Sequence, residues 1–570
     1  MTALIDYVAN NTLFVISIAT GVLTWFFLNR KPIRGDYAVT LYLLAFSLSY
    51  ILNRTFFPSI ISISKYWGIH IFSALLTTIL YRISPFHPLN AFPGPFWWRI
   101  TNLKLAYVSS QGKRHLIFHD LHQKYGPYVR IGPDVLSINS AQGLQVIYGN
   151  THHMEKSDAY ITPGHLDAVA LFFKQETKNI HSRRKRIWSA AFTGSNVLQF
   201  VTPLNNRTWQ LVQCIENRKD RNNVVDLSTC LAHWSYDFMG EMVFGGATNL
   251  ELMRDGDPNG LLDGLKTAAT ALDSFGQVPW LMDIIWHLPF GSSMHQIQHR
   301  AAAMMRKRQG AGWKVDMSDL ASYLLSGDPS TGQHLPQGDL DLDAVVAIQG
   351  GSDNTAIILS LAFFYLLSRR VTTTSGNQTR YYDQLYTELR SAIPDAKYLD
   401  INMNILTELP ILNGVINETL RLGSPFFLPR VVPSGGADIA GRFVPGGTIV
   451  ASAAYSQQID AENFWPEPME FRPERWCTGE LGSEYKTNRS ALASFSLGPH
   501  ACVAKSFAYQ ELRFVIARLV LALDMWLPSS ESNLFDPKAF EDGVVNMRTT
   551  MLLRPLLVCA EMRKSEGDEN

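Results

Sequence analysis

The chain has 570 residues, enough for one large domain with an additional segment. Basic and acidic residues number 50 each, so the formal net charge is zero and no nucleic-acid partner is expected. The five cysteines are scattered and include no CxxC pair, which argues against a disulfide framework and against a zinc site.

Three apolar stretches near the N-terminus predict membrane-spanning helices, over residues 13–28, 37–52 and 68–81. Arg30, Lys31 and Arg34 follow the first stretch, and the positive-inside rule places them in the cytosol. We therefore expect residues 1–84 to form an anchor in the endoplasmic reticulum membrane, with the rest of the chain cytosolic. The alternative is one spanning helix with two interfacial or core helices.

Two N-glycosylation motifs, Asn10-Asn11-Thr12 and Asn53-Arg54-Thr55, fall on the predicted lumenal side. Asn10 and Asn53 are therefore the candidate glycosylation sites, although both lie close to the predicted membrane surface. Motifs in the cytosolic part should not be modified, because this glycosylation takes place in the lumen.

Closely spaced prolines over residues 85–99 predict an extended hinge after the anchor. From residue 100 to 563 the pattern is mainly helical, with a small β region. Short strands are predicted over residues 128–131, 135–138 and 448–452. Residues 564–570 form a charged tail, so we expect one large, mainly α domain behind the hinge.

A long helix is predicted from Asp343 to about Ser368, and it contains an unusual polar step. Gly350 and Gly351 precede Asp353-Asn354-Thr355, and each glycine costs a helix about 1 kcal/mol relative to alanine. This composition suits a helix that is locally opened so that a ligand can lie against it. The alternative is a kinked core helix whose polar side chains are satisfied internally.

Glu418 and Arg421 are spaced i and i+3, so they can pair on one face of a helix. Such a pair alone is weak evidence, because most are solvated surface pairs. The segment 464–476 is rich in proline and aromatic residues, and it offers Arg475 as a second cation for Glu418. We expect a buried glutamate between two arginines, which specifies local geometry more than it adds net stability.

Cys502 ends the segment Phe495-Ser496-Leu497-Gly498-Pro499-His500-Ala501-Cys502, directly before a predicted helix. A helix N-terminus favours negative charge, and a thiolate held there is suited to ligating a haem iron. Gly498 and Pro499 allow the backbone to approach a flat cofactor closely. The alternative is a buried structural cysteine that opens an ordinary core helix.

The glycine-bearing acidic helix, the ExxR pair, the proline-rich segment and the cysteine loop follow one another in this order. Together they resemble the cytochrome P450 family, over about Ala91 to Leu557. The N-terminal helices resemble a fungal, membrane-anchored subgroup that includes tryprostatin B 6-hydroxylase. The resemblance implies the cytochrome P450 fold, mainly α with a small β region, preceded by transmembrane helices and enclosing one haem b.

The resemblance implies roles for individual residues, in four groups. The axial iron ligand and the fixed positions of its loop are Cys502, Phe495 and Gly498. The structural triad is Glu418, Arg421 and Arg475. The distal group that relays protons to bound dioxygen is Asp353, Asn354 and Thr355. The remaining haem contacts, chiefly to the propionates, are Arg430, His500, His181 and Lys185.

Three positions depart from the family pattern. His500 stands where the loop usually carries an arginine; histidine titrates near neutral pH, so haem retention is expected to depend on pH. Asn354 stands where a threonine usually follows the acid, and its amide can hold a water but cannot relay a proton as a hydroxyl does. Ala504 replaces a glycine, which tightens the packing beside the cysteine.

By resemblance the chain is a haem-thiolate monooxygenase that oxidises an apolar small molecule, of terpenoid or alkaloid class, in fungal secondary metabolism. It would use dioxygen and electrons from NADPH delivered by NADPH–cytochrome P450 reductase, because the chain shows no dinucleotide motif after a strand. A cytochrome b-type protein is a further candidate electron donor. Two alternatives stay open: a thiolate-haem isomerase or dehydratase that uses no dioxygen, and a non-catalytic haem-binding membrane protein.

Position along the chain suggests which side chains line a substrate pocket. Those before the glycine pair and after the ExxR helix are Val345, Val346, Gln349 and Pro425–Leu428. Those expected to form the roof are Phe275, Trp280 and Trp286. The alternative for these aromatic residues is ordinary core or membrane-surface contact.

Overall fold

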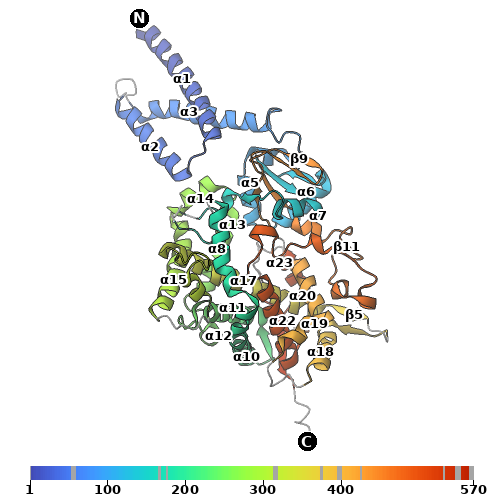
Figure 1. Ribbon diagram of the computed structural model, residues 1–570. Coiled ribbons are helices and arrows are strands. Elements are labelled where there is room, and N and C mark those ends of the chain that lie inside the picture. Colours follow the sequence, from blue (N-terminus) through green and yellow to red (C-terminus); the bar gives the residue numbers. More distant parts are fainter. Residues whose placement is uncertain are drawn as a thin grey trace.

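The computed structural model describes residues 2–52, 59–162, 164, 168–174, 177–311, 319–372, 376–394, 401–423, 426–529, 533–545 and 554–563. These residues are mainly helical with a small β region, as predicted (Figure 1). The helices are α1 (Thr2–Arg30), α2 (Gly35–Leu52), α3 (Ile60–Ile83), α4 (Phe96–Ile100), α5 (Leu103–Ser110), α6 (Arg114–Tyr125), α7 (Ala141–Tyr148), α8 (Lys178–Ala191), α9 (Gly194–Val197), α10 (Val201–Arg218), α11 (Leu227–Phe244), α12 (Leu252–Asp255), α13 (Leu261–Phe275), α14 (Pro279–Trp286), α15 (Ser292–Gly310), α16 (Leu320–Ser326), α17 (Gln337–Ser368), α18 (Tyr381–Ala392), α19 (Met403–Glu408), α20 (Pro410–Gly423), α21 (Ala454–Gln458), α22 (Lys505–Ala522) and α23 (Pro537–Val545).

The strands are short and form small sheets. They are β1 (Tyr128–Arg130), β2 (Val135–Ile138), β3 (Glu155–Lys156), β4 (Val224–Asp226), β5 (Arg370–Thr372), β6 (Gln378–Arg380), β7 (Arg430–Val431), β8 (Ala437–Ile439), β9 (Arg442–Val444), β10 (Ile449–Ser452), β11 (Phe464–Trp465), β12 (Lys486–Thr487), β13 (Leu523–Trp526) and β14 (Leu557–Met562). The largest sheet has the order β1-β2-β10-β7-β3. Its β1–β2 hairpin and β10 confirm the three predicted strands, and β2 pairs in parallel with β10.

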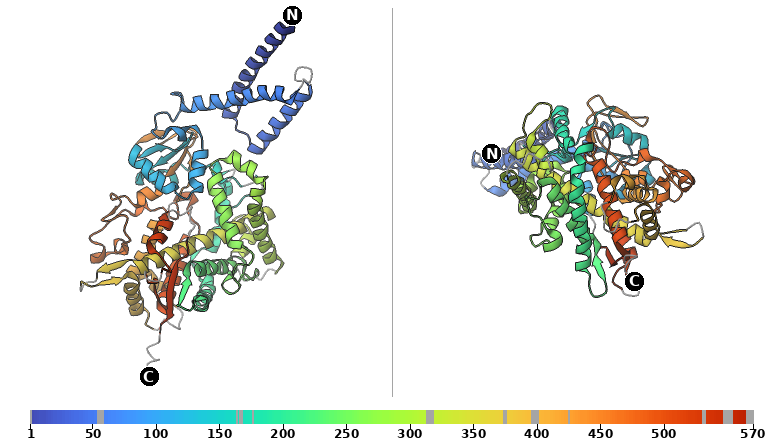
Figure 2. Two further views of the ribbon diagram at one scale, coloured as in Figure 1. Left: turned by 180° about the vertical axis from the view of Figure 1, so that it is seen from behind. Right: turned by 60° about the horizontal axis from the view of Figure 1, so that its bottom comes forward.

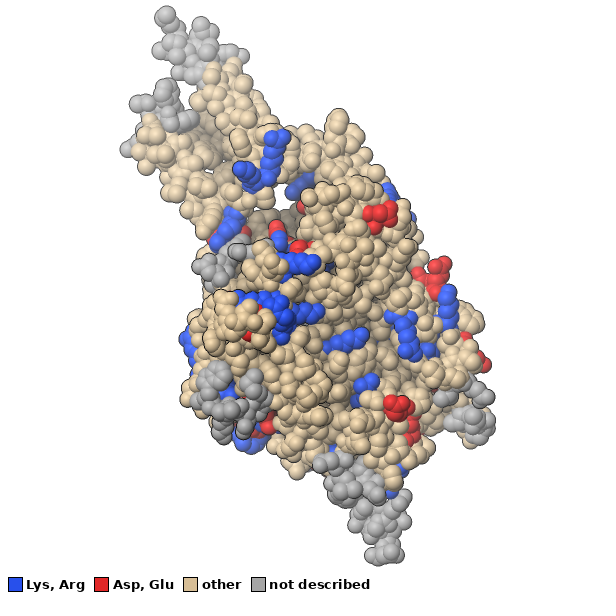
Figure 3. All heavy atoms as spheres, viewed as in Figure 1, with Lys and Arg blue, Asp and Glu red and all other residues tan. Residues whose placement is uncertain are grey.

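The helices α1, α2 and α3 project from the body (Figures 1 and 2). Each is long and apolar enough to cross a membrane, and at most 11 % of its most apolar window is buried. Figure 3 shows little charge over these helices, with lysine and arginine side chains where they meet the body. By the same criteria α17 also qualifies, but 83 % of its window is buried, so α17 is a core helix.

The helices α1 and α3 differ in extent from the predicted membrane spans. α1 begins at Thr2 and α3 at Ile60, so both are longer than the apolar stretches. Asn10 therefore lies within α1, where its side-chain oxygen accepts a hydrogen bond from the Tyr66 hydroxyl of α3 (2.7 Å). Asn53 and the tail 564–570 lie outside the described residues, and glycosylation at Asn10 and Asn53 stays a prediction.

The long helix α17 runs through the middle of the body (Figure 2). It packs against α11, α15 and α20, and almost every side chain from residue 355 to 367 is buried. Its neighbour α11 has clear ends: the Asp226 side chain accepts a hydrogen bond from the Thr229 N–H, and Gly245 adopts a left-handed conformation after the last turn. These caps fix the helix on which α17 rests.

Candidate functional site

The cysteine loop is held by its own backbone and by close contact with α7. The Cys502 N–H donates to the Phe495 carbonyl at 2.8 Å, which closes the loop ahead of α22. Gly498 has φ of +62°, and a Cβ there would lie 2.4 Å from the Tyr148 carbonyl oxygen. Only glycine fits this position, in agreement with the close approach expected from the sequence.

Opposing effects act on the Cys502 thiol. Burial raises its pKa, whereas the Ala504 N–H and the cations Lys185 and Lys505 lower it. Lys185 is fixed at this place because its ammonium donates to the Pro499 carbonyl at 2.8 Å. The Ala504 N–H and the two lysines thus favour the thiolate, whereas burial opposes it.

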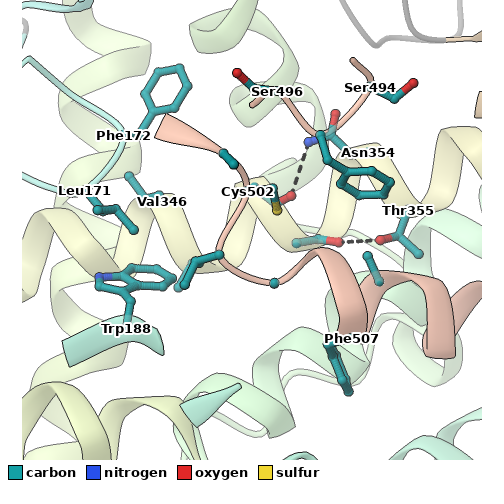
Figure 4. Close-up of a pocket in the computed structure, with 18 of the residues that line it drawn as sticks. Leu171, Phe172, Trp188, Val346, Asn354, Thr355, Ser494, Ser496, Cys502 and Phe507 are labelled. Carbon is teal, nitrogen blue, oxygen red and sulfur yellow. Dashed lines mark hydrogen bonds between the residues drawn. The ribbon is translucent and has the colours of Figure 1, made fainter. Parts of the chain in front are cut away.

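Cys502 lines a cavity of about 340 Å³ whose wall is mainly apolar. Figure 4 shows the cysteine loop beside α17, with Leu171, Phe172 and Val346 at one side of the cavity. Phe495 and Gly350 also contribute to this wall. The cavity therefore joins the predicted iron ligand to the predicted distal helix.

Some of the predicted pocket residues line this cavity, namely Val346, Phe426 and Leu428. Val345 and Gln349 are not among its described lining residues, and the Gln349 amide donates instead to the Leu265 carbonyl (3.1 Å). Pro425 lies outside the described residues.

The predicted aromatic roof does not line the cavity. Phe275 and Trp286 pack with Met282 and Met294 in a separate cluster, and Trp280 is 49 % exposed. Among the described residues, Tyr160, Leu171 and Phe172 provide cavity wall that the sequence analysis missed. They precede α8 in a segment with no helical or strand periodicity, so no pattern marked them.

The backbone of α17 is continuous through Gly350 and Gly351, so the expected local opening is wrong. The Asn354 amide donates to the Gly350 carbonyl (3.2 Å) and the Thr355 hydroxyl to the Gly351 carbonyl (2.9 Å). The Asn354 and Thr355 side chains thus find hydrogen-bond partners within α17 itself. A Cβ at Gly351 would lie 2.3 Å from the Met239 methyl carbon, whereas a Cβ at Gly350 would meet nothing within 4 Å, and Gly350 lines the cavity.

Asp353 points from α17 toward α11. Its carboxylate accepts a hydrogen bond from the Tyr236 hydroxyl at 2.7 Å, and it is not among the described residues that line the cavity. Burial raises the pKa of Asp353, and the Tyr236 hydrogen bond opposes that shift. Asn354 and Thr355 do line the cavity, so the structure separates the three predicted distal residues into two groups.

The predicted haem contacts Arg430, His181, Lys185 and His500 all line the cavity. The His500 Nδ1 and His181 Nε2 atoms are 3.1 Å apart, so one ring donates to the other. Burial, followed by repulsion from Lys156, lowers the pKa of His500 to about 2 and that of His181 to about 4. The expectation that His500 titrates near neutral pH is therefore wrong for this structure.

The structure brings the predicted triad together in the core. Glu418 accepts hydrogen bonds from the Arg421 Nη2 (2.6 Å) and from the Arg475 Nε (2.9 Å), and all three side chains are inaccessible to solvent. The Trp476 indole N–H (2.8 Å) and the Arg472 N–H (2.9 Å) complete the set of donors. Burial alone would raise the pKa of Glu418, but the arginines outweigh it and the pKa is lowered.

The comparisons with known proteins agree with this geometry. A family model described as cytochrome P450 matches residues 92–553 of the chain. The chain belongs to the cytochrome P450 family. The family, the monooxygenase class and the fold predicted from the motifs are thereby confirmed.

Several fungal P450s are similar to this one. Cytochrome P450 67 of Uromyces fabae is 29 % identical over 95 % of this chain and 98 % of its own length. The cytochrome P450 monooxygenase phqL of Penicillium fellutanum is 31 % identical over 76 % of this chain and 74 % of its own. Tryprostatin B 6-hydroxylase of Aspergillus fumigatus is 29 % identical, over 81 % and 79 % of the two chains.

The residues of this P450 fit a haem. The Cys502 sulfur is a suitable soft ligand for iron, and the apolar wall suits a flat macrocycle. The buried Arg430 side chain is 2 % exposed, and no carboxylate forms a salt bridge with it in the described part of the chain. A buried cation of this kind fits the carboxylates of the cofactor.

Glu511 of α22 is a site residue that the sequence analysis missed. Its Oε2 atom is 3.4 Å from the Thr355 hydroxyl, it lines the cavity, and Oε1 has no hydrogen-bond partner among the described residues. Burial raises the pKa of Glu511 to about 8, so this P450 holds a proton there at neutral pH. The sequence feature that could have indicated Glu511 is its position as a single carboxylate within the apolar helical pattern that follows Cys502.

Proposed function

We propose that this P450 is a haem-thiolate monooxygenase that hydroxylates or otherwise oxidises an apolar small molecule, of terpenoid or alkaloid class, in fungal secondary metabolism. The observation that carries the proposal is the shared cavity, in which the Cys502 thiol and the distal side chains of α17 meet behind an apolar wall. When bound, haem supplies the activation of dioxygen and the transfer of one oxygen atom to the substrate. The relatives named tryprostatin B 6-hydroxylase support hydroxylation of a small molecule.

The chain's own residues bind, orient and exclude water. Cys502 would ligate the iron, and Arg430 with the other basic side chains of the cavity wall would hold the cofactor's carboxylates. Leu171, Phe172 and Val346 would keep bulk water away from an apolar substrate. The protonated Glu511 carboxyl beside Thr355 holds a proton next to the distal helix, where the reaction consumes protons.

The proposal extends to the membrane and to electron transfer. α1, α2 and α3 would span the endoplasmic reticulum membrane, with residues 31–34 and the catalytic body in the cytosol. Apolar substrate would enter from the membrane. NADPH would donate electrons through NADPH–cytochrome P450 reductase, with a cytochrome b-type protein as a second candidate donor.

The carbon-monoxide difference spectrum of dithionite-reduced membranes tests the cofactor assignment. We expect the strongly red-shifted Soret band of a thiolate-ligated haem in the parent and its loss in Cys502→Ala, because no other thiol is expected to reach the iron. Cys477→Ala is the matched control, since Cys477 is only partly buried and its sulfur contacts the Pro410 carbonyl instead.

A parent that takes up haem without this band would exclude Cys502 as the thiolate ligand and refute the proposal. A normal band together with substrate conversion that consumes no NADPH or dioxygen would instead support the isomerase or dehydratase alternative. Asn354 motivates this alternative, because its amide cannot relay a proton as the hydroxyl of the usual threonine does.

A further inference from the structure

A buried ion cluster joins α8 to the first turns of α17. The Arg184 guanidinium of α8 donates to the Asp343 carboxylate at 2.6 Å and also to Asp339, one turn earlier on α17. Each of the three side chains is at most 11 % exposed. A buried cluster of this kind contributes more to one defined local geometry than to net stability.

The second oxygen of each carboxylate holds the backbone of residues 168–174. The Val169 N–H donates to Asp339 at 2.9 Å, and the Leu171 N–H donates to Asp343 at 3.0 Å. Residues 168–174 contain no helix or strand, so these bonds replace hydrogen bonds that regular structure would supply. The ion cluster therefore ties this segment to α17.

The three parts that meet at the ion cluster all supply side chains to one side of the cavity. These are Leu171 and Phe172 from residues 168–174, Trp188 from α8 and Val346 from α17 (Figure 4). Trp188 lies four residues after Arg184, on the same face of α8. Val346 lies three residues after Asp343, on the same face of α17. The ion cluster thus lies one helical turn from the side chains that form this side.

The segment 168–174 has little apolar packing of its own against α17. Ala170 and Phe173 form a small cluster with Leu342, whereas Phe172 is 43 % exposed. The Lys156 ammonium of β3 donates to two carbonyls of the segment. A short segment that buries so little apolar surface depends on its polar bonds for a fixed position. The bonds to the two carboxylates are those that fix it against α17.

We propose that Arg184, Asp339 and Asp343 are positioning residues that set this side of the cavity and thereby determine which apolar substrates fit. None of the three lines the cavity in the described part of the chain, so they act through the side chains that the segment and the two helices present. The inference deepens the proposed function and rests on it. A change in the ion cluster should alter the contact with an apolar ligand and leave the iron ligand in place.

Two ligands that differ by one phenyl ring test this inference on the full-length, haem-loaded protein. Imidazole and 4-phenylimidazole both bind a haem iron through a ring nitrogen, but only 4-phenylimidazole also offers a ring to the apolar wall. In spectral titrations, we expect Asp343→Ala to raise the Kd of 4-phenylimidazole about tenfold, because the phenyl ring loses apolar contact. The Kd of imidazole should stay within about twofold of the parental value, since the cysteine loop is unchanged.

Asp237→Ala is the matched control for loss of a buried aspartate. Asp237 is fully buried and accepts two backbone N–H bonds, from Leu252 (2.6 Å) and Met253 (2.8 Å), but none of these residues lines the cavity. It should leave the ratio of the two Kd values unchanged. Hydrogen exchange of residues 168–174, measured without ligand, should become several-fold faster in Asp343→Ala and not in Asp237→Ala.

A parental Kd of 4-phenylimidazole in folded Asp343→Ala would overturn the inference, as would an equal loss of imidazole affinity or an equal change in Asp237→Ala. If Asp343→Ala does not fold, Asp339→Ala applies the same test at the more exposed carboxylate of the cluster. A parent that takes up no haem would refute the proposed function itself, and the exchange of residues 168–174 would then decide the positioning role alone.

Discussion

At the scale of single residues, Glu511 is a cavity residue whose ionisation is altered by burial. It lies in a cavity wall beside Thr355, without a cation to pair with among the described residues. Burial raises its pKa to about 8, so folding favours the protonated form. The carboxyl is thereby suited to hold a proton rather than a negative charge at neutral pH.

Glu511 should make stability depend on pH in a defined direction. A carboxyl whose pKa is higher in the folded state stabilises the fold fully below its unfolded value of 4.5, and this contribution is lost as pH rises toward about 8. We expect the thermal midpoint of the parent to fall from pH 5 to pH 8 more than that of Glu511→Gln, which cannot ionise. Equal slopes for Glu511→Gln and for the exposed Glu408→Gln would contradict this.

At the scale of elements, Glu418 fastens the proline-rich segment to α20. Its carboxylate accepts from Arg421 on the same helix and from Arg475 and Trp476 of the segment. The segment from 464 to 476 has little regular structure, so these bonds replace the hydrogen bonds that a helix or sheet would supply.

Removing the charge of Glu418 should therefore unfold this region. Glu418→Gln leaves the Arg421 and Arg475 side chains buried without a counter-ion, which we expect to destabilise the protein by about 3–5 kcal/mol. The thermal midpoint and the yield of haem-loaded protein in membranes measure the effect. Glu462→Gln, an exposed position two residues before the segment, is the control, and comparable losses in both variants would contradict the role of the triad.

At the scale of the whole molecule, the anchor contacts the body at two places. The Gly35 N–H at the start of α2 donates to Asp283 of α14 (2.8 Å), and the His287 ring lies 3.3 Å from Asp36. At the end of α3, the Arg82 guanidinium donates to the Ile100 carbonyl (2.6 Å). The N-terminal helices α2 and α3 are thus packed onto the body rather than tethered through a free linker.

The contact at Gly35 permits a direct test. A Cβ at Gly35 would lie 1.9 Å from the Trp280 carbonyl oxygen, so Gly35→Val should separate α2 from α14. We expect hydrogen exchange in the α14 peptide to become several-fold faster, because its surface opens. Gly68→Val in α3 is the control, since a Cβ there meets nothing within 4 Å, and unchanged α14 exchange in Gly35→Val would refute the docking contact.

The local sequence was sufficient to predict several helices, two strands and one ion pair of the structure. The apolar stretches predicted α1 to α3, the alternation around residues 128–138 predicted β1 and β2, and the spacing of Glu418 and Arg421 predicted their pairing. In each case the determining interactions lie within a few residues along the chain, or depend only on polarity. The order of the motifs also sufficed for the family, because the motifs together are far more specific than any one alone.

Tertiary structure alone decided the composition of the site. Lys156 faces Arg430, Glu511 meets Thr355, and Phe172 rather than Trp286 lines the cavity, in each case through contacts between distant segments. The continuity of α17 and the low pKa of His500 likewise depend on neighbours from other elements. Burial and the charges of packed neighbours set these properties, and neither is encoded in the local pattern of residues.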